Sequence, residues 1–212
     1  GDEAGTALTT GDSNVAVGYT ALDASETASG NTAVGYAALT ATTTGDRNTA
    51  LGQSAMAANT TGDRSVGIGF QALNAQNPSS NADMYNTAVG YNAGTLITTG
   101  GQNTAIGAAS LDANTTADNN TAVGYASLGA NTTGTRNTAL GSSAGAAVTT
   151  GDDNTALGFN AGDLITTGSD NTAVGSYSFT TNSTGSKNTA IGYTALEGNT
   201  TADNNTGIGY AA

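Results

Sequence analysis

Apolar and polar residues follow the same order in a short sequence motif that occurs twelve times, almost always 17 residues apart. Each copy opens on Asn, or once on Ser, and most copies continue with Thr, Ala, an aliphatic residue and Gly. The copies begin at residues 14, 31, 48, 65, 86, 103, 120, 137, 154, 171, 188 and 205. One interval is 21 residues, and it contains the only proline, Pro78. A fixed short period over a whole chain is typical of a solenoid.

Within one copy the pattern predicts a short strand followed by turns. Counted from the opening Asn, position 4 is always Val, Ile or Leu, position 3 is Ala or Gly, and position 5 is always Gly. A segment this short and β-branched favours a strand. Its aliphatic and small side chains point to opposite faces, and we expect both faces to be buried, the small one against another backbone. The later Thr-Thr-Gly-Asp is typical of a turn, so we expect two short strands and two turns in each coil.

Positions 9 and 12 exchange their character from copy to copy. Most copies have a large apolar residue and then a polar one, as in Leu128 and Asn131, whereas others have Gly and then an aliphatic residue, as in Gly145 and Val148. We infer that one core slot is filled from either position. The sequence therefore predicts an all-β fold, a β-solenoid (β-roll or β-helix) of about twelve 17-residue coils. It forms one repetitive segment over residues 1–212, with an inserted loop near residues 75–85.

Composition and charge narrow the function. The chain has no Cys and no His, which removes the commonest ligands of zinc, haem and iron–sulfur sites and the usual nucleophile–base pairs. The net charge is −12, with only three Arg and one Lys, so nucleic acid is not an expected partner. No apolar run approaches the ~20 residues that span a bilayer as a helix. We expect no enzymatic activity, no cofactor and no membrane insertion.

Assembly is expected because each coil has few large apolar side chains to offset the entropy that its folding costs. Symmetric association is the usual way to bury more surface, and we expect three chains around one axis. Neither end carries the polar coil that caps a solenoid. We therefore expect a homotrimeric segment of a longer fibre.

The stretch from Asn31 to Gly52 reads NTAVGYAALTATTTGDRNTALG and resembles the repeats of tail-fibre-domain proteins of phages and aquatic bacteria. More distantly, Ala-Ile-Gly at residues 105–107 is similar to the head repeats of trimeric autotransporter adhesins. The resemblance covers about residues 4–212 and implies a homotrimeric β-roll or β-helix in an elongated surface fibre. The coil here is longer than the adhesin repeat. Position 2 is usually Thr where the adhesins carry a second aliphatic residue; only Val15 and Val66 conform.

An aromatic residue follows the invariant Gly in eight copies, at position 6. These residues are Tyr19, Tyr36, Phe70, Tyr91, Tyr125, Phe159, Tyr193 and Tyr210. Such a stripe could stack on the sugar rings of host or environmental surface glycans. The alternative is a packing ladder that covers the coil edge, which the four interruptions of the column favour.

Three carboxylates, Asp152, Asp153 and Asp170, are a candidate Ca²⁺ site. The chain has neither the EF-hand spacing nor the nonapeptide of calcium β-rolls, so a solvated acidic face is the simpler interpretation. Position 17 runs Arg136, Asp153, Asp170 and Lys187 in successive coils. Stacking would therefore pair opposite charges at both ends of this column.

Asn and Thr columns raise two further interpretations. Five residues open glycosylation sequons, although turn chemistry explains them as well: Asn59, Asn114, Asn131, Asn182 and Asn199. An ice-binding face would need two Thr columns that point the same way. Adjacent Thr residues such as Thr60 and Thr61 point to opposite faces if they are extended, and the Thr at position 2 shares its face with the aliphatic residue.

The sequence favours a structural fibre segment, like the shaft or head of a tail fibre, that gives extracellular reach and surface attachment. The alternative is a bacterial cell-surface adhesin or an extracellular matrix filament. An ice-binding protein, or a solenoid glycan-active enzyme built on the same three carboxylates, is less favoured. We expect the chain outside the cell, on a virion tail fibre or a bacterial surface, with further copies of itself as partners.

Overall fold

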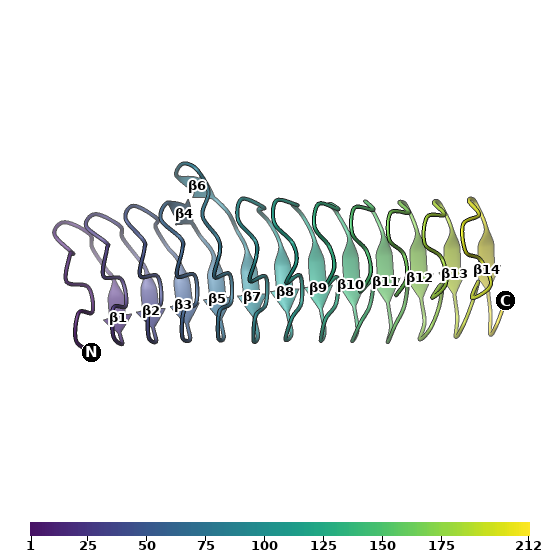
Figure 1. The fold of residues 1–212 in the computed structure, drawn as a ribbon, viewed down its shortest axis with the longest axis horizontal. Coiled ribbons are helices and arrows are strands. Elements are labelled where there is room, and N and C mark those ends of the chain that lie inside the picture. Colours follow the sequence, from purple (N-terminus) through teal and green to yellow (C-terminus); the bar gives the residue numbers. More distant parts are fainter.

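The chain forms an elongated row of stacked coils with its two termini at opposite ends (Figure 1). A computed structural model describes all 212 residues, and it contains strands and turns but no helix. Twelve strands form a single parallel sheet in which neighbours follow sequence order. The predicted β-solenoid with coils of about 17 residues is therefore confirmed.

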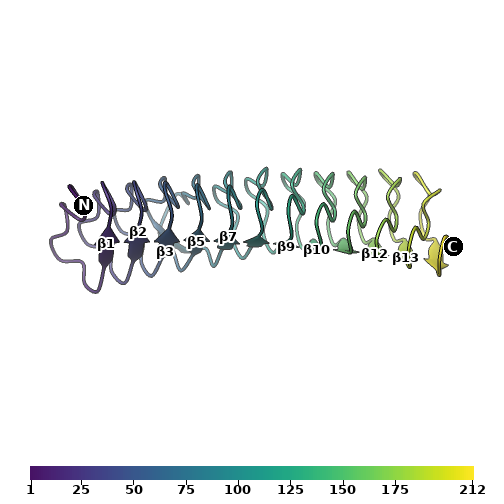
Figure 2. The ribbon, with the colours of Figure 1, turned by 90° about the horizontal axis from the view of Figure 1, so that it is seen from below.

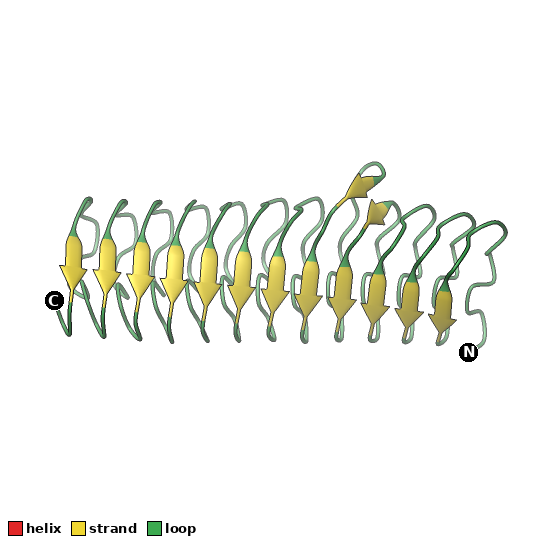
Figure 3. Cartoon of the chain, turned by 180° about the vertical axis from the view of Figure 1, so that it is seen from behind, coloured by secondary structure: helices red, strands yellow, loops and turns green.

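Each strand of this sheet has three residues and begins one residue after the opening Asn or Ser of its coil. The strands are β1 (Val15–Val17), β2 (Thr32–Val34), β3 (Thr49–Leu51), β5 (Val66–Ile68), β7 (Thr87–Val89), β8 (Thr104–Ile106), β9 (Thr121–Val123), β10 (Thr138–Leu140), β11 (Thr155–Leu157), β12 (Thr172–Val174), β13 (Thr189–Ile191) and β14 (Thr206–Ile208). All of them lie along one side of the rod, and the crossing turns lie on the other (Figures 2 and 3).

The register pairs each residue of a strand with the residue at the same coil position in the neighbouring strand. Between β10 and β11, for example, Thr138 pairs with Thr155, Ala139 with Ala156 and Leu140 with Leu157. Neighbouring strands in a sheet lie ~4.8 Å apart, so the twelve strands extend over roughly 53 Å. Each coil position thus becomes a column of side chains along the rod.

Every coil turns at left-handed residues, and this excludes the second strand that we expected. In the coil of residues 120–136, φ is +135° at Gly124, +52° at Ala126, +49° at Leu128 and +57° at Arg136, and the other coils repeat these values closely. Such residues break a strand, but their N–H groups still bond to a neighbouring coil: Leu128 N donates to Ala144 O of the next coil at 3.0 Å, and Ala126 N donates to Ala108 O of the preceding coil at 3.0 Å. The prediction of two strands per coil is wrong, because alternate left-handed residues replace the second strand with turns.

The small side chains at position 3 point into the coil. Ala139 is fully buried, whereas Leu140 beside it is 49% exposed. The inward residue packs on the large side chain of position 9, since a Cβ added at Gly67 would lie 2.9 Å from Met56 Cγ. The expectation that the small face packs against another chain is therefore wrong, because the coil itself covers that face. Within one chain the aliphatic face is not buried.

One core slot is filled from either of two positions, as predicted. Leu111 and Leu128 at position 9 are buried, and so are Ile97 and Val148 at position 12. A Cβ added at Gly94 would lie 2.9 Å from Ile97 Cδ1. An aliphatic residue at position 12 therefore occupies the space that a position-9 side chain takes in the other coils.

The long interval forms a protrusion on one edge of the rod (Figure 1). Its strand β6 (Ala82–Asp83) pairs with β4 (Gly62–Asp63) outside the main sheet. Thr44 Oγ1, two coils earlier, donates a hydrogen bond of 2.8 Å to Asn81 Oδ1, and Asp83 forms an ion pair with Arg64. The extra residues thus fold back over preceding coils, and β5 pairs with β7 without a gap.

Candidate functional site

The most distinctive surface is the outer face of the sheet. We define it as the side chains at coil positions 2 and 4, which are the first and third residues of each of the twelve strands. None of the position-4 residues is buried. This column consists of Val17, Val34, Leu51, Ile68, Val89, Ile106, Val123, Leu140, Leu157, Val174, Ile191 and Ile208. A continuous apolar stripe of exposed and half-buried residues is unusual on a protein surface and is typical of an interaction surface.

The position-2 column beside it is Thr in ten of the twelve strands. Thr121 and Thr138 are typical: the register aligns them, and neither hydroxyl bonds to another group of the chain. No Asp, Glu, Lys or Arg occupies positions 2 to 6 of these twelve coils. The outer face is therefore an uncharged stripe on a rod of net charge −12.

The predicted aromatic column borders the outer face and is exposed except at the half-buried Phe70, with Tyr125 at 64%. Ring centroids lie 5.6 Å apart in the stacked pair Tyr19–Tyr36 and 5.2 Å apart in Phe70–Tyr91. Nearly parallel rings at these distances are too close to lie side by side in one plane, so they form offset stacks. Each ring covers part of its neighbour's face, which leaves less of that face for a sugar. Glycan contact by this column stays a prediction.

Sequence reasoning missed Tyr177, which continues the column where Ser176 interrupts it. The Tyr177 ring lies edge-on to Phe159, with 5.3 Å between centroids, and to Tyr193, with 6.1 Å. The signal was present in the sequence as an aromatic residue directly after the polar one. Four rings from Phe159 to Tyr210 therefore form an unbroken ladder.

The three carboxylates proposed for Ca²⁺ are not gathered into one site. Asp152 accepts hydrogen bonds from Thr135 N at 2.6 Å and Thr135 Oγ1 at 2.9 Å. Asp153 binds Arg136 through two bonds of 2.7 Å, and this hydrogen bond holds the pKa of Asp153 below its usual value. No group of three or more acidic side chains is arranged to hold a metal ion. Calcium binding remains a prediction without a ligand set.

Charge pairing along position 17 occurs at one end only. Arg136–Asp153 and Arg64–Asp83 are the two ion pairs of the structure. Lys187 takes part in neither, so the predicted pairing of Asp170 with Lys187 is wrong.

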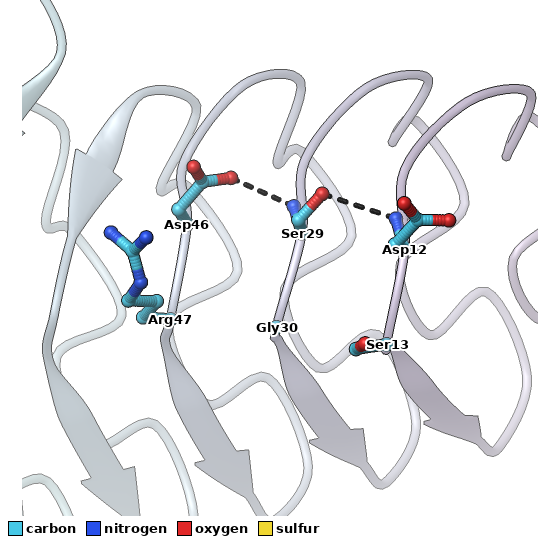
Figure 4. A pocket seen from close by; sticks show the side chains of 6 residues that line it. All are labelled: Asp12, Ser13, Ser29, Gly30, Asp46 and Arg47. Atoms are coloured by element: carbon cyan, nitrogen blue, oxygen red, sulfur yellow. Dashed lines mark hydrogen bonds between the residues drawn. The ribbon is translucent and has the colours of Figure 1, made fainter.

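Position 16 carries a ladder of side chains that cap the backbone of the preceding coil. Asp46 Oδ1 accepts a 2.7 Å hydrogen bond from Ser29 N, and Ser29 Oγ accepts one of 3.1 Å from Asp12 N (Figure 4). These residues, with Ser13, Gly30 and Arg47, line a surface recess. Because its carboxylate and hydroxyl groups hold neighbouring coils together, this recess is part of the scaffold. The same contact explains why Asp recurs at position 16.

Two other carboxylates sit in less polar surroundings. Partial burial raises the pKa of Asp112 and of Asp163, both at position 10. No basic side chain forms an ion pair with either of them. They are isolated acids on the turn side of the rod, and no second titratable group stands beside them for acid–base chemistry.

Most of the sequon Asn residues are inside the coil. Asn59 is fully buried, its Nδ2 donates to Gly62 O at 2.9 Å, and its Oδ1 accepts from Gly62 N at 3.0 Å. Asn114, Asn131 and Asn182 are buried as well. The folded coils therefore do not present these four amides for glycosylation, and Asn59, Asn114 and Asn131 cap the turn that follows them.

The structure has no helix with the length and apolarity needed to cross a bilayer. Comparisons with protein-family models, with curated proteins and with solved structures each found no match.

Proposed function

We propose that this chain is a structural segment of an extracellular fibre that provides reach and surface attachment, as in the shaft or head of a tail fibre. The observation that supports it is the uninterrupted stack of twelve strands. A rod in which each coil bonds to the next transmits force along its axis and holds its surface columns in a fixed line. Nothing in the proposal calls for catalysis or a cofactor.

A bacterial cell-surface adhesin or a matrix filament is the second candidate. Its support is the exposed aromatic column, because the parts of the rings that stacking leaves uncovered can contact surface glycans. Both candidates place the chain outside the cell, and they differ in what anchors the fibre.

Antibodies raised against residues 1–212 test the location. Immunogold labelling of the source cells and of virions released from them should mark filaments on one of the two surfaces. Labelling of virion fibres supports the tail-fibre assignment, and labelling of the cell envelope supports the adhesin. Label confined to the cytosol contradicts both.

The homotrimer that the resemblance implies remains a separate proposal. One physical reason for it has gone, since the small-residue face lies inside the coil. Its remaining support is the aliphatic column of the outer face, none of which is buried within one chain.

A further inference from the structure

We propose that two stacked tyrosine pairs, Tyr19–Tyr36 and Tyr193–Tyr210, are sites of oxidative cross-linking between neighbouring coils of the same chain. The modification joins the two rings of a pair by a carbon–carbon bond. Its co-reactant is hydrogen peroxide, used by a one-electron oxidant of the haem peroxidase class. This chemistry needs only the folded rod and does not depend on where the fibre is located.

The register of the sheet holds the two rings of each pair face to face. Ring centroids lie 5.6 Å apart at an interplanar angle of 21° in Tyr19–Tyr36, and 5.4 Å apart at 17° in Tyr193–Tyr210. Both members of a pair occupy position 6 of adjacent coils whose strands pair in register, so their backbones lie ~4.8 Å apart. A radical on one ring therefore has the other ring as a permanently adjacent reaction partner.

Exposure directs oxidation to these phenols. Sulfur-containing side chains are oxidised readily when they are accessible, but this chain has no Cys, no His and no Trp. Its two methionines, Met56 and Met84, are buried. The four paired tyrosines are 46% to 80% exposed. An oxidant in solution therefore meets tyrosine as the oxidisable side chain of the surface.

The reaction balances with the peroxide as the terminal oxidant. Each phenol gives up one electron and its hydroxyl proton, which leaves an unpaired electron shared between the oxygen and the two Cε atoms of the ring. Two such radicals form a bond between one Cε of each ring. The hydrogens of those two carbons then move to the phenol oxygens and restore both hydroxyl groups. The two electrons and two protons that were released reduce one hydrogen peroxide to two waters.

The bridge joins residues that are 17 positions apart and fixes one coil to the next. Exposed side chains change rotamer within nanoseconds, so the rings can rotate from the stack into bonding contact without movement of the backbone. A closed loop of this length constrains the unfolded chain as a disulfide does. The chain has no Cys that could form a disulfide.

Other tyrosines are internal controls because no phenol stacks on them. Tyr91 stacks on Phe70, with ring centroids 5.2 Å apart at an interplanar angle of 10°. No aromatic ring lies beside Tyr85 or Tyr125. Tyr177 meets Tyr193 edge-on. The geometry therefore selects two pairs out of eight tyrosines.

The first test treats the whole folded chain with a haem peroxidase and hydrogen peroxide. Digestion and mass spectrometry should find one bridge from Tyr19 to Tyr36 and one from Tyr193 to Tyr210, each lighter than its two peptides by two hydrogen atoms. Dityrosine fluorescence should appear with them. Absence of both bridges, or bridges from Tyr91 and Tyr125 in equal yield, overturns the proposal.

A matched pair of variants tests the stacked geometry without disturbing the fold. Phe70→Tyr supplies a phenol where a ring already stacks on Tyr91, so it should add a third bridge. Tyr36→Phe keeps its ring and should abolish the bridge to Tyr19 while leaving the one between Tyr193 and Tyr210. No new bridge in the first variant, or a link from Tyr193 to Tyr177 in place of Tyr210, contradicts the role of stacking.

Isotope mixing shows whether each bridge lies within one chain. Unlabelled chains and chains labelled with heavy nitrogen are mixed, unfolded and refolded together, and then oxidised. The bridged peptides should be entirely light or entirely heavy. Bridges that join a light peptide to a heavy one would show coupling between copies and would overturn the assignment to neighbouring coils. Either outcome leaves the location test of the fibre proposal unaffected.

Discussion

Glycine at position 5 meets two constraints in the same residue. Its φ of +127° to +142° lies in a region that side-chain-bearing residues avoid. A Cβ at Gly124 would also lie 2.4 Å from the carbonyl oxygen of Gly141 in the next coil. The sequence showed the column, and the structure shows its two causes, the positive φ of each Gly and the close approach of the next coil.

Gly124→Ala should lower the free energy of unfolding by roughly 3 kcal/mol or more, through backbone strain and overpacking together. Chemical denaturation followed by circular dichroism measures it. Gly198→Ala is the control, because a Cβ there meets nothing within 4 Å. Equal effects of the two substitutions would contradict the close-approach argument.

Partial burial of Asp163 should make the stability of the folded chain depend on pH. Its raised pKa means that folding favours the protonated form, so stability falls as pH rises from the unfolded value near ~3.9 through the folded pKa. Asp163→Asn should therefore raise the melting temperature at pH 7 and flatten its dependence on pH in that window.

Asp153 should change stability with pH in the opposite direction, because its hydrogen bond to Arg136 lowers its pKa. Its contribution is present at neutral pH and is lost as pH falls through the folded pKa. Asp153→Asn should lower the melting temperature at pH 7. Thermal melts of both variants between pH 3 and pH 7 compare them, and shifts of the same sign would refute this account.

At the scale of the element, the turns depend on a ladder of buried Asn at position 1. Asn137 Nδ2 donates to Gly151 O at 2.7 Å, and its Oδ1 accepts from Asn154 N at 2.9 Å. One amide therefore closes its own coil and holds the next one. This explains why Asn recurs beside each strand although it is a poor strand former.

Asn137→Ala should cost roughly 2–4 kcal/mol, because it leaves a buried N–H and a buried C=O unpaired. Asn137→Ser should cost less, since Ser65 occupies this position naturally and its Oγ accepts from Asn86 N at 3.3 Å. Urea denaturation of both variants gives the comparison. A Ser variant as unstable as the Ala variant would show that the bond to the next coil does not matter.

The shared core slot predicts a rescue. Leu128→Gly empties a buried site and should cost roughly 3 kcal/mol. Adding Asn131→Val should recover most of that loss, because Gly145 and Val148 form the same pair one coil later. Asn131→Val alone should destabilise by overpacking. Additive losses in the double variant would mean that the two positions fill different space.

At the scale of the whole molecule, the period itself is the structural constraint. Every column, polar or apolar, depends on each coil returning to the same register, and the 21-residue interval keeps it by expelling its extra residues as a protrusion. The chain can therefore accommodate added residues in the turns along one edge of the rod. It cannot accommodate a strand that is out of register with its neighbours.

Deletion of one whole coil, residues 120–136, should keep the fold, because Asn137 then takes the place of Asn120. Deletion of residues 120–135 removes one residue fewer and leaves Arg136 in the place of a buried Asn, with every following residue displaced by one. Circular dichroism and thermal melting should show a cooperative β structure for the first variant and its loss, at least beyond the deletion, for the second. Similar melts for the two would refute the register argument.

Sequence alone determined the solenoid, the place of each strand, the glycine column and the exchange of positions 9 and 12. These are consequences of stacking identical coils, so the period carries them. Only the tertiary structure decided which strand face is inside, because alternation puts Ala and the aliphatic residue on opposite faces without saying which one the chain encloses. The left-handed residues at positions 7, 9 and 17 bend the chain so that it closes on the side of the strand that carries Ala. The narrow interior holds this Ala together with one large side chain per coil. The aliphatic column, which the sequence suggested as core, is thereby left on the surface as the candidate interface.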